Sequence, residues 1–558
     1  MSTATPSSRD AAADTPPASP TYSSYPSDKD KERAASSGND DAVDPKTLRR
    51  ADIERLGRQR PAVLAHWFTE AGFVFAVVTS MMMSEYFIGG FNIVLPPIAD
   101  ALAMPPSSRA WPAAAANLSA AALLQPFARL CDLYGGRAIF LGGHAWLLAW
   151  SLASGFSGGT AVLTVCRAMQ GVGAAAILPA GLALLSRAYR PGPRKNFVFA
   201  VYGAFSCIGF YFGIFMGAVS VEYLDWRWYF WIGAILGLVV GLSGVLTIPR
   251  NLGDVDPDAR MDWWGVVTIV PGVVLVVFAF TDGGRAPDGW CTPYIQVTFV
   301  LGVLLLVAAV YVQGWVSSQP LLPPELFRQP HMKRLMGSLF CSYGVFGLLL
   351  LYASFYIETV MHTPPILTAV WFTPMAVGGM FLTIGSGFIL HMVCNRILMI
   401  ISCLGYLLAS LLFALIPDPA SSGKSTSFLY WAYVFPAMLG GTLGIDITFS
   451  VTNVYVTTAM PRRHQAAASG LVNSLLFLSV AFWLGITELA VSAAMRTRGD
   501  GEGEGGLEPR EQYKIGFWTC VALSAVSLCL MVTVRMGQAE AAMTADEKAK
   551  LEQEADQT

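Results

Sequence analysis

Long apolar stretches separated by short polar loops make up most of this 558-residue chain. A bilayer span needs about 20 mostly apolar residues, because the hydrocarbon core is about 30 Å thick and a helix rises about 1.5 Å per residue. Fourteen stretches are long enough: 71–96, 111–130, 138–156, 161–186, 197–220, 228–248, 263–281, 294–315, 335–357, 364–390, 394–416, 428–454, 467–490 and 514–534. The runs are continuous, which favours helices over a barrel. The pattern predicts an all-α polytopic membrane protein with fourteen transmembrane helices.

Basic residues in the loops lie mostly on one side of the predicted membrane. Assigning alternate loops to the cytoplasm collects fourteen of them: Arg129, Arg137, Arg187, Arg190, Arg194, Lys195, Arg250, Arg260, Arg328, Lys333, Arg334, Arg396, Arg462 and Arg463. The opposite loops carry Arg109, Arg227, Arg285 and Lys424, plus four more after the thirteenth stretch. Cytoplasmic loops carry such an excess. With an even number of crossings, both termini are predicted to be cytoplasmic.

Two loops indicate an internal duplication. ARLCDLYGGR, after the second stretch, and GFILHMVCNR, after the tenth, match at a constant offset, since 391 − 132 and 396 − 137 both give 259. The last six stretches therefore look like a copy of the first six, with two stretches inserted between them. This 6+2+6 organisation predicts a disordered cytoplasmic tail (1–66), a six-helix repeat (67–250), a two-helix linker (251–332), a second repeat (333–535) and a second tail (536–558).

Composition narrows the classes of partner. Hydrophobic residues make up 54% of the chain and charged residues 13%, and the net charge is −2. With no basic stripe interleaved with aromatics, we expect no nucleic-acid partner. The nine cysteines form no CxxC pair, so neither a disulfide framework nor a metal site is expected. DPASSGKS has Asp418 where a phosphate-binding loop needs its first glycine. We expect no cofactor, no catalytic residues and no enzymatic activity.

Three motifs resemble signatures of the major facilitator superfamily. ARLCDLYGGRAIF (128–140) is similar to its loop between helices 2 and 3, and LTVCRAMQGVGAAAILPAG (163–181) is similar to its helix 4. GFYFGIFMGA (209–218) falls where exporters carry GxxxGPxxGG, with Ile214 and Ala218 replacing the Pro and the last Gly. The resemblance implies the major facilitator fold and alternating access between two six-helix halves.

Further segments look like the fourteen-span drug:H+ antiporter branch and its fungal efflux transporters. These are FNIVLPPIA (91–99), DWRWYFW (225–231), Asp262-Trp263-Trp264-Gly265 and PLLPPELF (320–327), and the resemblance covers roughly residues 70–490. That branch carries an acid five residues before the Asn of the first segment, where this chain has Phe87. Glu85 lies nearby but about 200° around the helix.

The resemblance also implies roles for polar residues. The loop residues Asp132, Gly135, Arg137, His391 and Arg396 would form a conformational latch, and the alternative is an ordinary glycine turn with solvated charges. Glycines at 171, 173, 209, 213 and 217 would allow close helix packing. The latch and the glycines concern motion and packing rather than the transported molecule.

Ionisable residues inside apolar stretches are costly and commonly functional. Glu85 and Asp446 are candidate proton carriers. The resemblance implies that Arg167 takes part in proton coupling, and Gln170 is a further candidate for coupling or for lining the cavity. A structural acid bonded to a neighbouring helix, or an arginine reaching toward the outer surface, is the alternative reading. Glu488 is expected near the outer surface, in contact with water.

The sequence therefore favours a proton-coupled secondary transporter that exports a small organic molecule, such as a drug, toxin or secondary metabolite. An importer or organic-acid carrier of the same fold is one alternative, and a non-transporting sensor is another. We expect a monomer in the lipid bilayer, with protons and a small organic substrate as partners. The plasma membrane is the expected location and the vacuolar membrane the alternative.

Overall fold

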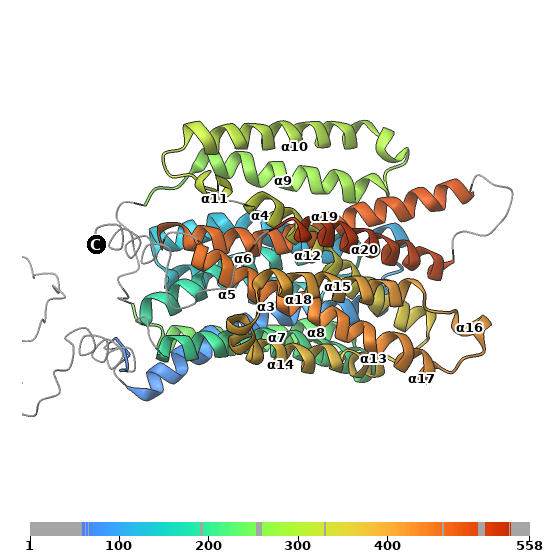
Figure 1. The fold of residues 1–558 in the computed structure, drawn as a ribbon, viewed down its shortest axis with the longest axis horizontal. Helices are drawn as coiled ribbons and strands as arrows, with labels where there is room; N and C mark the ends of the chain where they lie inside the picture. The colour runs from blue at the N-terminus through green and yellow to red at the C-terminus, as the bar shows by residue number, and fades with distance from the viewer. Residues whose placement is uncertain are drawn as a thin grey trace, which may run out of the picture. The chain divides into compact units, whose positions relative to one another are not determined.

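The computed structural model describes residues 59–61, 63, 64, 66–189, 193–250, 252, 259–328, 331–459, 462–499, 508–534 and 536. The regular elements in these ranges are all helical (Figure 1). Thirteen helical segments are long and apolar enough to cross a membrane. The predicted span 111–130 lies in the 24-residue helix α4 (Trp111–Tyr134), which is not among the thirteen. Most of the predicted tails 1–66 and 536–558 lies outside the described residues.

The first six long helices form one bundle, which we call the N-bundle. They are α3 (Trp67–Ala101), α4 (Trp111–Tyr134), α5 (Gly136–Gly155), α6 (Thr160–Ala188), α7 (Pro193–Tyr223) and α8 (Trp226–Thr247). Gly135 separates α4 from α5, because its φ of 85° suits glycine and ends the helix. Asp225 caps α8 by accepting a hydrogen bond from the Arg227 backbone N–H.

The last helices form a second bundle, the C-bundle. It contains α12 (Met332–Phe355) continued by η4 (Tyr356–Val360), α13 (Pro365–Trp371) with α14 (Thr373–Met392), α15 (Asn395–Ala414), α17 (Thr426–Leu429), η5 (Tyr430–Val434) and α18 (Phe435–Ala459), α19 (Arg462–Gly499) and α20 (Pro509–Val532). The short helices α11 (Glu325–Arg328) and α16 (Pro419–Ser422) lie in connections.

Both bundles use the same pairs of helices in the same order. In the N-bundle α3 packs on α7 and α8, α4 on α6, and α5 on α6 and α8. In the C-bundle α12 packs on α19 and α20, α14 on α18, and α15 on α18 and α20. Each helix thus repeats the contacts of its counterpart in the other bundle.

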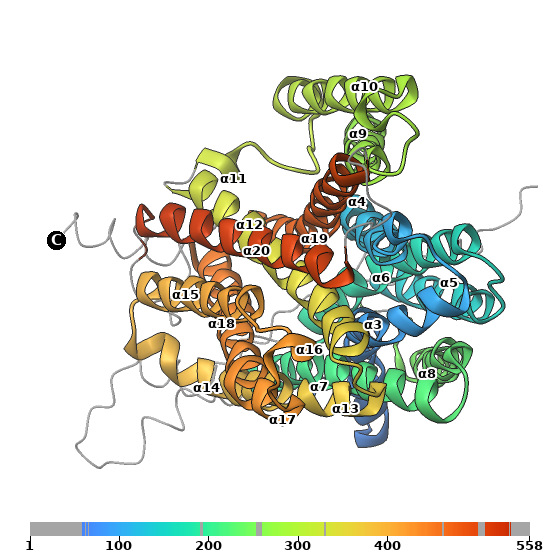
Figure 2. The same cartoon turned by 90° about the vertical axis from the view of Figure 1, so that its right-hand side faces the viewer.

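Two seams join the bundles. Helix α4 packs on α19 at one seam, and α7 packs on α13 and α14 at the other. Between the bundles in sequence come α9 (Trp263–Gly283), η2 (Gly289–Cys291), α10 (Pro293–Tyr311) and η3 (Val312–Val316). Helix α9 contacts both α4 and α19, and α10 packs on α9, on the side away from the bundles (Figure 2). We call the end of the bundles that carries loop 102–110 the outer end, following the charge pattern.

Candidate functional site

Two carboxylates from different bundles meet near helix α7. Glu85 of α3 lies beside the Ser206 hydroxyl and within electrostatic range of Asp446. Asp446 of α18 accepts a hydrogen bond from the Cys207 thiol, with the sulfur 3.7 Å from Oδ1. Both acids are half-buried. Successive residues of α7 therefore touch one carboxylate from each bundle.

Helix α14 completes the surroundings of Asp446. The Cys207 sulfur lies 3.4 Å from the Thr383 hydroxyl. A Cβ atom added at Gly379 would lie 2.9 Å from Asp446 Oδ2, so the carboxylate occupies space that only a glycine leaves open. Sequence reasoning identified the two acids but missed Ser206, Cys207, Gly379 and Thr383, because neutral or small residues within apolar stretches give no distinct signal.

Arg167 stays inside the N-bundle, apart from the two acids. Its guanidinium donates to the Gln170 side-chain oxygen at 2.8 Å and to the Phe87 carbonyl at 3.1 Å. It also lies 3.9 Å from the centre of the Phe91 ring, a cation–π contact. Gln170 in turn donates to the Ser151 hydroxyl. Only 3% of Arg167 is exposed, so it does not reach toward the outer surface.

Helix α6 is joined to α3 through a backbone carbonyl and an aromatic ring. The Phe87 carbonyl receives the Arg167 guanidinium. This carbonyl and the Phe91 ring are both in contact with the buried cation. The arrangement fastens α6 to the turn of α3 that follows Glu85.

The residues of the predicted latch contact neighbouring helix ends. Asp132 accepts a hydrogen bond from Arg187 at 2.9 Å, which joins the end of α4 to the end of α6. Arg137 donates to the Val245 carbonyl at 3.0 Å, near the end of α8. In the C-bundle, Arg396 donates to the Val532 carbonyl of α20 at 2.6 Å. The side chain of His391 lies outside the described residues.

Arg137 and Arg396 therefore make the same contact in the two bundles. Each begins the third helix of its bundle and donates to a carbonyl at the end of the sixth. Cations are favoured at helix C-termini, where the last carbonyls lack intrahelical partners. The repeated contact is the structural counterpart of the 259-residue offset.

Glycines on α7 let its backbone approach that of α3. A Cβ atom added at Gly209 would lie 2.5 Å from the Met82 carbonyl oxygen, and one at Gly213 would lie 2.4 Å from the Tyr86 carbonyl oxygen. Gly217 continues this face against Val94. On α6, Gly171 abuts the Ala116 carbonyl of α4, and Gly173 abuts Leu147 of α5. The spacing of four residues places the α7 glycines on one face of the helix.

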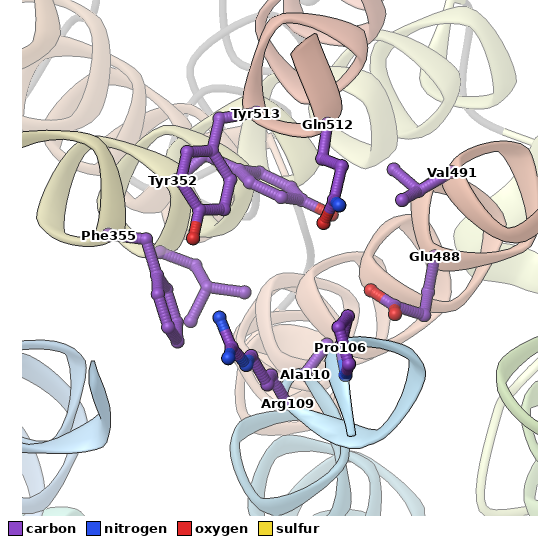
Figure 3. Close-up of a pocket in the computed structure, with 10 residues that line it drawn as sticks. Pro106, Arg109, Ala110, Tyr352, Phe355, Glu488, Val491, Gln512 and Tyr513 are labelled. Carbon is purple, nitrogen blue, oxygen red and sulfur yellow. The ribbon is translucent and has the colours of Figure 1, made fainter. Parts of the chain in front are cut away.

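A small cavity at the outer end lies between the bundles (Figure 3). Its volume of about 30 Å³ has room for roughly one water molecule. Arg109, from the loop before α4, lies 5.9 Å from the centre of the Phe355 ring. Tyr352 and Tyr513 line the cavity from α12 and α20, and Glu488 lines it from α19. This outer cluster packs loop 102–110 against the C-bundle.

Glu488 lies at the outer end, as expected, but the expected contact with water was wrong. Its exposed fraction is 5%, so the acid is buried rather than in contact with bulk water. The reason is the loop before α4, which lies over this end of α19 and brings Arg109 within electrostatic range of the carboxylate. A sequence position near the end of an apolar stretch does not show which loop covers it.

A second polar cluster lies at the opposite end of α3. Glu70 accepts hydrogen bonds from Arg194 at 2.7 and 2.6 Å, from Arg60 at 3.0 Å and from the Tyr189 hydroxyl at 3.0 Å. The bonds to Glu70 raise the pKa of the Arg194 guanidinium, and burial beside Glu70 raises the pKa of the Tyr189 phenol. A cavity of about 810 Å³ opens beside this cluster, lined mainly by apolar residues of α3 and α7 such as Phe205.

The part of the chain with described side chains contains no group of three or more His, Cys, Asp or Glu residues placed to hold a metal ion. The polar groups are instead distributed along the helices and seams. The carboxylates among them can bind and release protons.

Comparisons with known proteins agree with this geometry. Residues 72–484 match the family model of the Major Facilitator Superfamily. The chain is 29% identical to the efflux pump terJ of Aspergillus terreus, over 77% of this chain and 82% of that protein. It is 33% identical to the puromycin resistance protein pur8 of Streptomyces alboniger, over 69% and 74%. It is 27% identical to a low affinity ammonium transporter of Saccharomyces cerevisiae, over 88% and 92%.

Solved structures agree at the level of the fold. An auto-inhibited peptide transporter of the POT family has a TM-score of 0.60 at 13% sequence identity, covering 84% of this chain and 98% of that chain. The human organic anion transporter MFSD10 has a TM-score of 0.52 at 14% identity, covering 83% and 99%. The prediction of a membrane transporter rather than an enzyme is confirmed by the family match. The chain belongs to the Major Facilitator Superfamily.

Proposed function

We propose that this protein exports a small organic molecule in exchange for protons, by alternating access between its two bundles. The observation that carries the proposal is the pair of acids, Glu85 on the N-bundle and Asp446 on the C-bundle, brought together at α7. A proton on either carboxylate removes the repulsion between them. Protonation therefore favours a close approach of the bundles here, and proton release favours their separation.

The direction of transport is supported by the relatives. The proteins named efflux pump terJ and puromycin resistance protein pur8 are similar over at least 69% of this chain. The cavity in the outer cluster has a volume of about 30 Å³ and the one beside Glu70 about 810 Å³, as expected of a carrier that takes up its substrate at the end opposite to the outer cluster. Fourteen crossings, cytoplasmic termini, a monomeric state and the plasma membrane belong to the same proposal.

Arg167 and Gln170 have a supporting role in this proposal. They hold α6 against the turn of α3 after Glu85, which keeps the acid facing α7. Asp132, Arg137 and Arg396 hold helix ends together within each bundle, so that each bundle moves as a unit.

The test is flux in vesicles with an imposed pH gradient, for a panel that includes puromycin and methylammonium. We expect Glu85→Gln and Asp446→Asn each to lower proton-driven flux by about ten-fold or more, since a step that depends on proton binding loses its driving force. Glu325→Gln is the matched control, because Glu325 is exposed and far along the chain from both acids. Unchanged pH-dependent flux in both variants would contradict the proposal.

A different substrate and direction form the second candidate. The similarity to the low affinity ammonium transporter extends over 88% of this chain and 92% of that protein, and the exporter motif on α7 lacks its proline at Ile214. Uptake of methylammonium that persists without a proton gradient would favour this candidate. Retention of puromycin in cells that lack the protein would favour export.

A further inference from the structure

Helices α9 and α10 pack on each other and form a hairpin between the two bundles in the sequence. Its helix α9 covers the α4/α19 seam. Leu118 of α4, Val277 of α9 and Ala481 of α19 form a buried cluster in which all three helices meet. Val273 and Val274 of α9 pack against the same cluster. Helix α9 is therefore attached to both of the bodies that alternating access would move.

The outer end of the hairpin is fastened to the C-bundle. Arg496 of α19 donates to the Gly284 carbonyl at 3.2 Å and to the Ala286 carbonyl at 2.5 Å, in the loop that follows α9. The Phe280 and Phe482 rings lie 5.1 Å apart, with Trp290 against Phe280. Toward the N-bundle, the ring contact at this level is Trp111 with Phe278, at 5.5 Å. The attachment to α19 is thus polar and aromatic, whereas the one to α4 is aromatic.

The opposite end of the hairpin is fastened to the N-bundle. Arg129 of α4 donates to the Arg260 carbonyl at 3.1 Å and to the Gln319 side-chain oxygen, so it holds the entry to and the exit from the hairpin. The Arg260 backbone N–H also donates to Gln319, at 2.9 Å. Arg129 further lies 3.9 Å from Asp132, one of the residues that join α4 to α6.

The hairpin is also rigid at this opposite end. Asp262 caps α9 through the Gly265 N–H and accepts hydrogen bonds from the Gln313 amide at 2.5 Å and from the Leu321 N–H. Gln313 accepts a hydrogen bond from the Leu322 N–H. The start of α9, η3 after α10 and the exit loop are therefore one hydrogen-bonded unit, and a pull on one of them is transmitted to the others.

We propose that the α9–α10 hairpin is a strap across the α4/α19 seam, carried by the C-bundle at its outer end and by the N-bundle at its opposite end. When the outer end opens, α9 leaves Trp111 and follows α19, while Arg129 keeps the other end on α4. The strap limits how far the seam can separate and stabilises the closed outer end. This inference rests on the alternating access proposed above.

The test joins the outer end of α9 to one bundle at a time. A Cβ atom built on Gly284 lies 3.0 Å from the Ser492 Cβ, short of the about 3.5–4.5 Å found in disulfides, so a small local shift lets G284C/S492C link α9 to α19. W111C/F278C, joined by a short bis-methanethiosulfonate that forms a reducible disulfide with each cysteine and releases sulfinate, links α9 to α4. Val491→Cys reports opening, because Val491 lines the outer cavity and is 4% exposed.

The readout is the rate at which a membrane-impermeant thiol reagent labels Val491→Cys, in protein whose exposed Cys291 and Cys529 are serine. We expect the α9–α4 link to slow labelling by about ten-fold or more and the α9–α19 link to change it by less than about two-fold. Reduction of either link restores the rate of the unlinked protein, which excludes misfolding. Equal effects of both links, or no effect of the α9–α4 link, would overturn the strap.

Two further outcomes separate the strap from the transport proposal. If unlinked Val491→Cys is never labelled, the outer end does not open, and alternating access fails together with the strap. If it is labelled and the links act alike, only the strap fails. Arg496→Ala should lower the yield of the G284C/S492C disulfide about three-fold or more, since two hydrogen bonds to the loop are lost. Arg227→Ala, at another outer loop, should leave that yield unchanged.

Discussion

The N-bundle and the C-bundle repeat one packing scheme but place their buried charge differently. Both pair the same helices, and both use an arginine at the start of the third helix to bind the end of the sixth. The N-bundle encloses Arg167 with its own carbonyl and amide groups, whereas Asp446 of the C-bundle is bonded across the seam, to Cys207 of α7. The repeated contacts lie within each bundle, and of the two unrepeated arrangements only the Cys207–Asp446 hydrogen bond crosses between the bundles.

Disrupting the packing between α3 and α7 should have the largest effect on the stability of the protein. Gly213→Ala places a Cβ atom 2.4 Å from the Tyr86 carbonyl oxygen, so the two backbones must separate. We expect a loss of about 1–3 kcal/mol of stability and less folded protein in the membrane. Gly237→Ala on α8 is the control, because its Cβ atom would meet nothing within 4 Å. Thermal unfolding of both variants in detergent measures the difference.

Substitution of Arg167 tests whether this buried charge contributes to stability rather than to proton coupling. Arg167→Met removes the bonds to the Phe87 carbonyl and to Gln170, so the unfolding midpoint should fall, with a cost of about 1–3 kcal/mol. Proton-driven flux per folded molecule should stay within about three-fold of the parent. The reverse pattern, an unchanged midpoint with lost pH dependence, would make Arg167 a coupling residue and remove the contrast with Asp446.

Substitutions of Arg137 and Arg396 test whether the repeated contact has the same effect in the two bundles. Arg137→Ala and Arg396→Ala each remove one bond to a helix-end carbonyl, which is worth about 1 kcal/mol at a partly exposed position. We expect small and similar losses of stability and a few-fold lower flux, measured by unfolding in detergent and by vesicle transport. A large effect at one site alone would show that the two bundles do not use the contact in the same way.

Substitution of Cys207 should have the smallest effect, measured as a change in flux. Cys207→Ser keeps a donor next to Asp446 and Thr383, so flux should stay within about two-fold of the parent. Cys207→Val removes the donor and should lower flux further, by about three-fold, in the same vesicle assay. Equal flux for Ser and Val would indicate that the Cys207–Asp446 contact has no part in coupling.

The fold could be predicted because each apolar stretch carries its own signal. Helix α4 is the exception in composition, since its alanines and polar residues such as Asn117 and Gln125 give it less apolar character than the other spans. It is nevertheless a continuous helix of 24 residues that packs on α6 and α19. Helix formation and packing thus follow the neighbours as well as local hydropathy.

The acids of the candidate site could be predicted from the sequence, but their neighbours could not. Glu85 and Asp446 stand out because an acid in an apolar stretch is rare. Their neighbour Ser206, and the Phe87 carbonyl that binds Arg167, have no distinctive signature, because a small side chain or a backbone oxygen can occur anywhere. The burial of Glu488 depends on the loop that carries Arg109. Residues so far apart in the sequence are brought into contact by the tertiary structure alone.

Because α3 and α7 approach closely, the repulsion between Glu85 and Asp446 depends on the separation of the two bundles. Gly209 and Gly213 bring the two backbones together, so that Glu85 and its α7 neighbours are held in one packed unit. In the proposed exchange, Asp446 moves relative to this unit. The repulsion between two charges at an effective dielectric of about 20 falls from about 3 kcal/mol at roughly 5 Å to about 2 kcal/mol at roughly 10 Å. In the proposed exchange, a few ångströms of rocking would therefore change the preference of the acid pair for holding or releasing a proton.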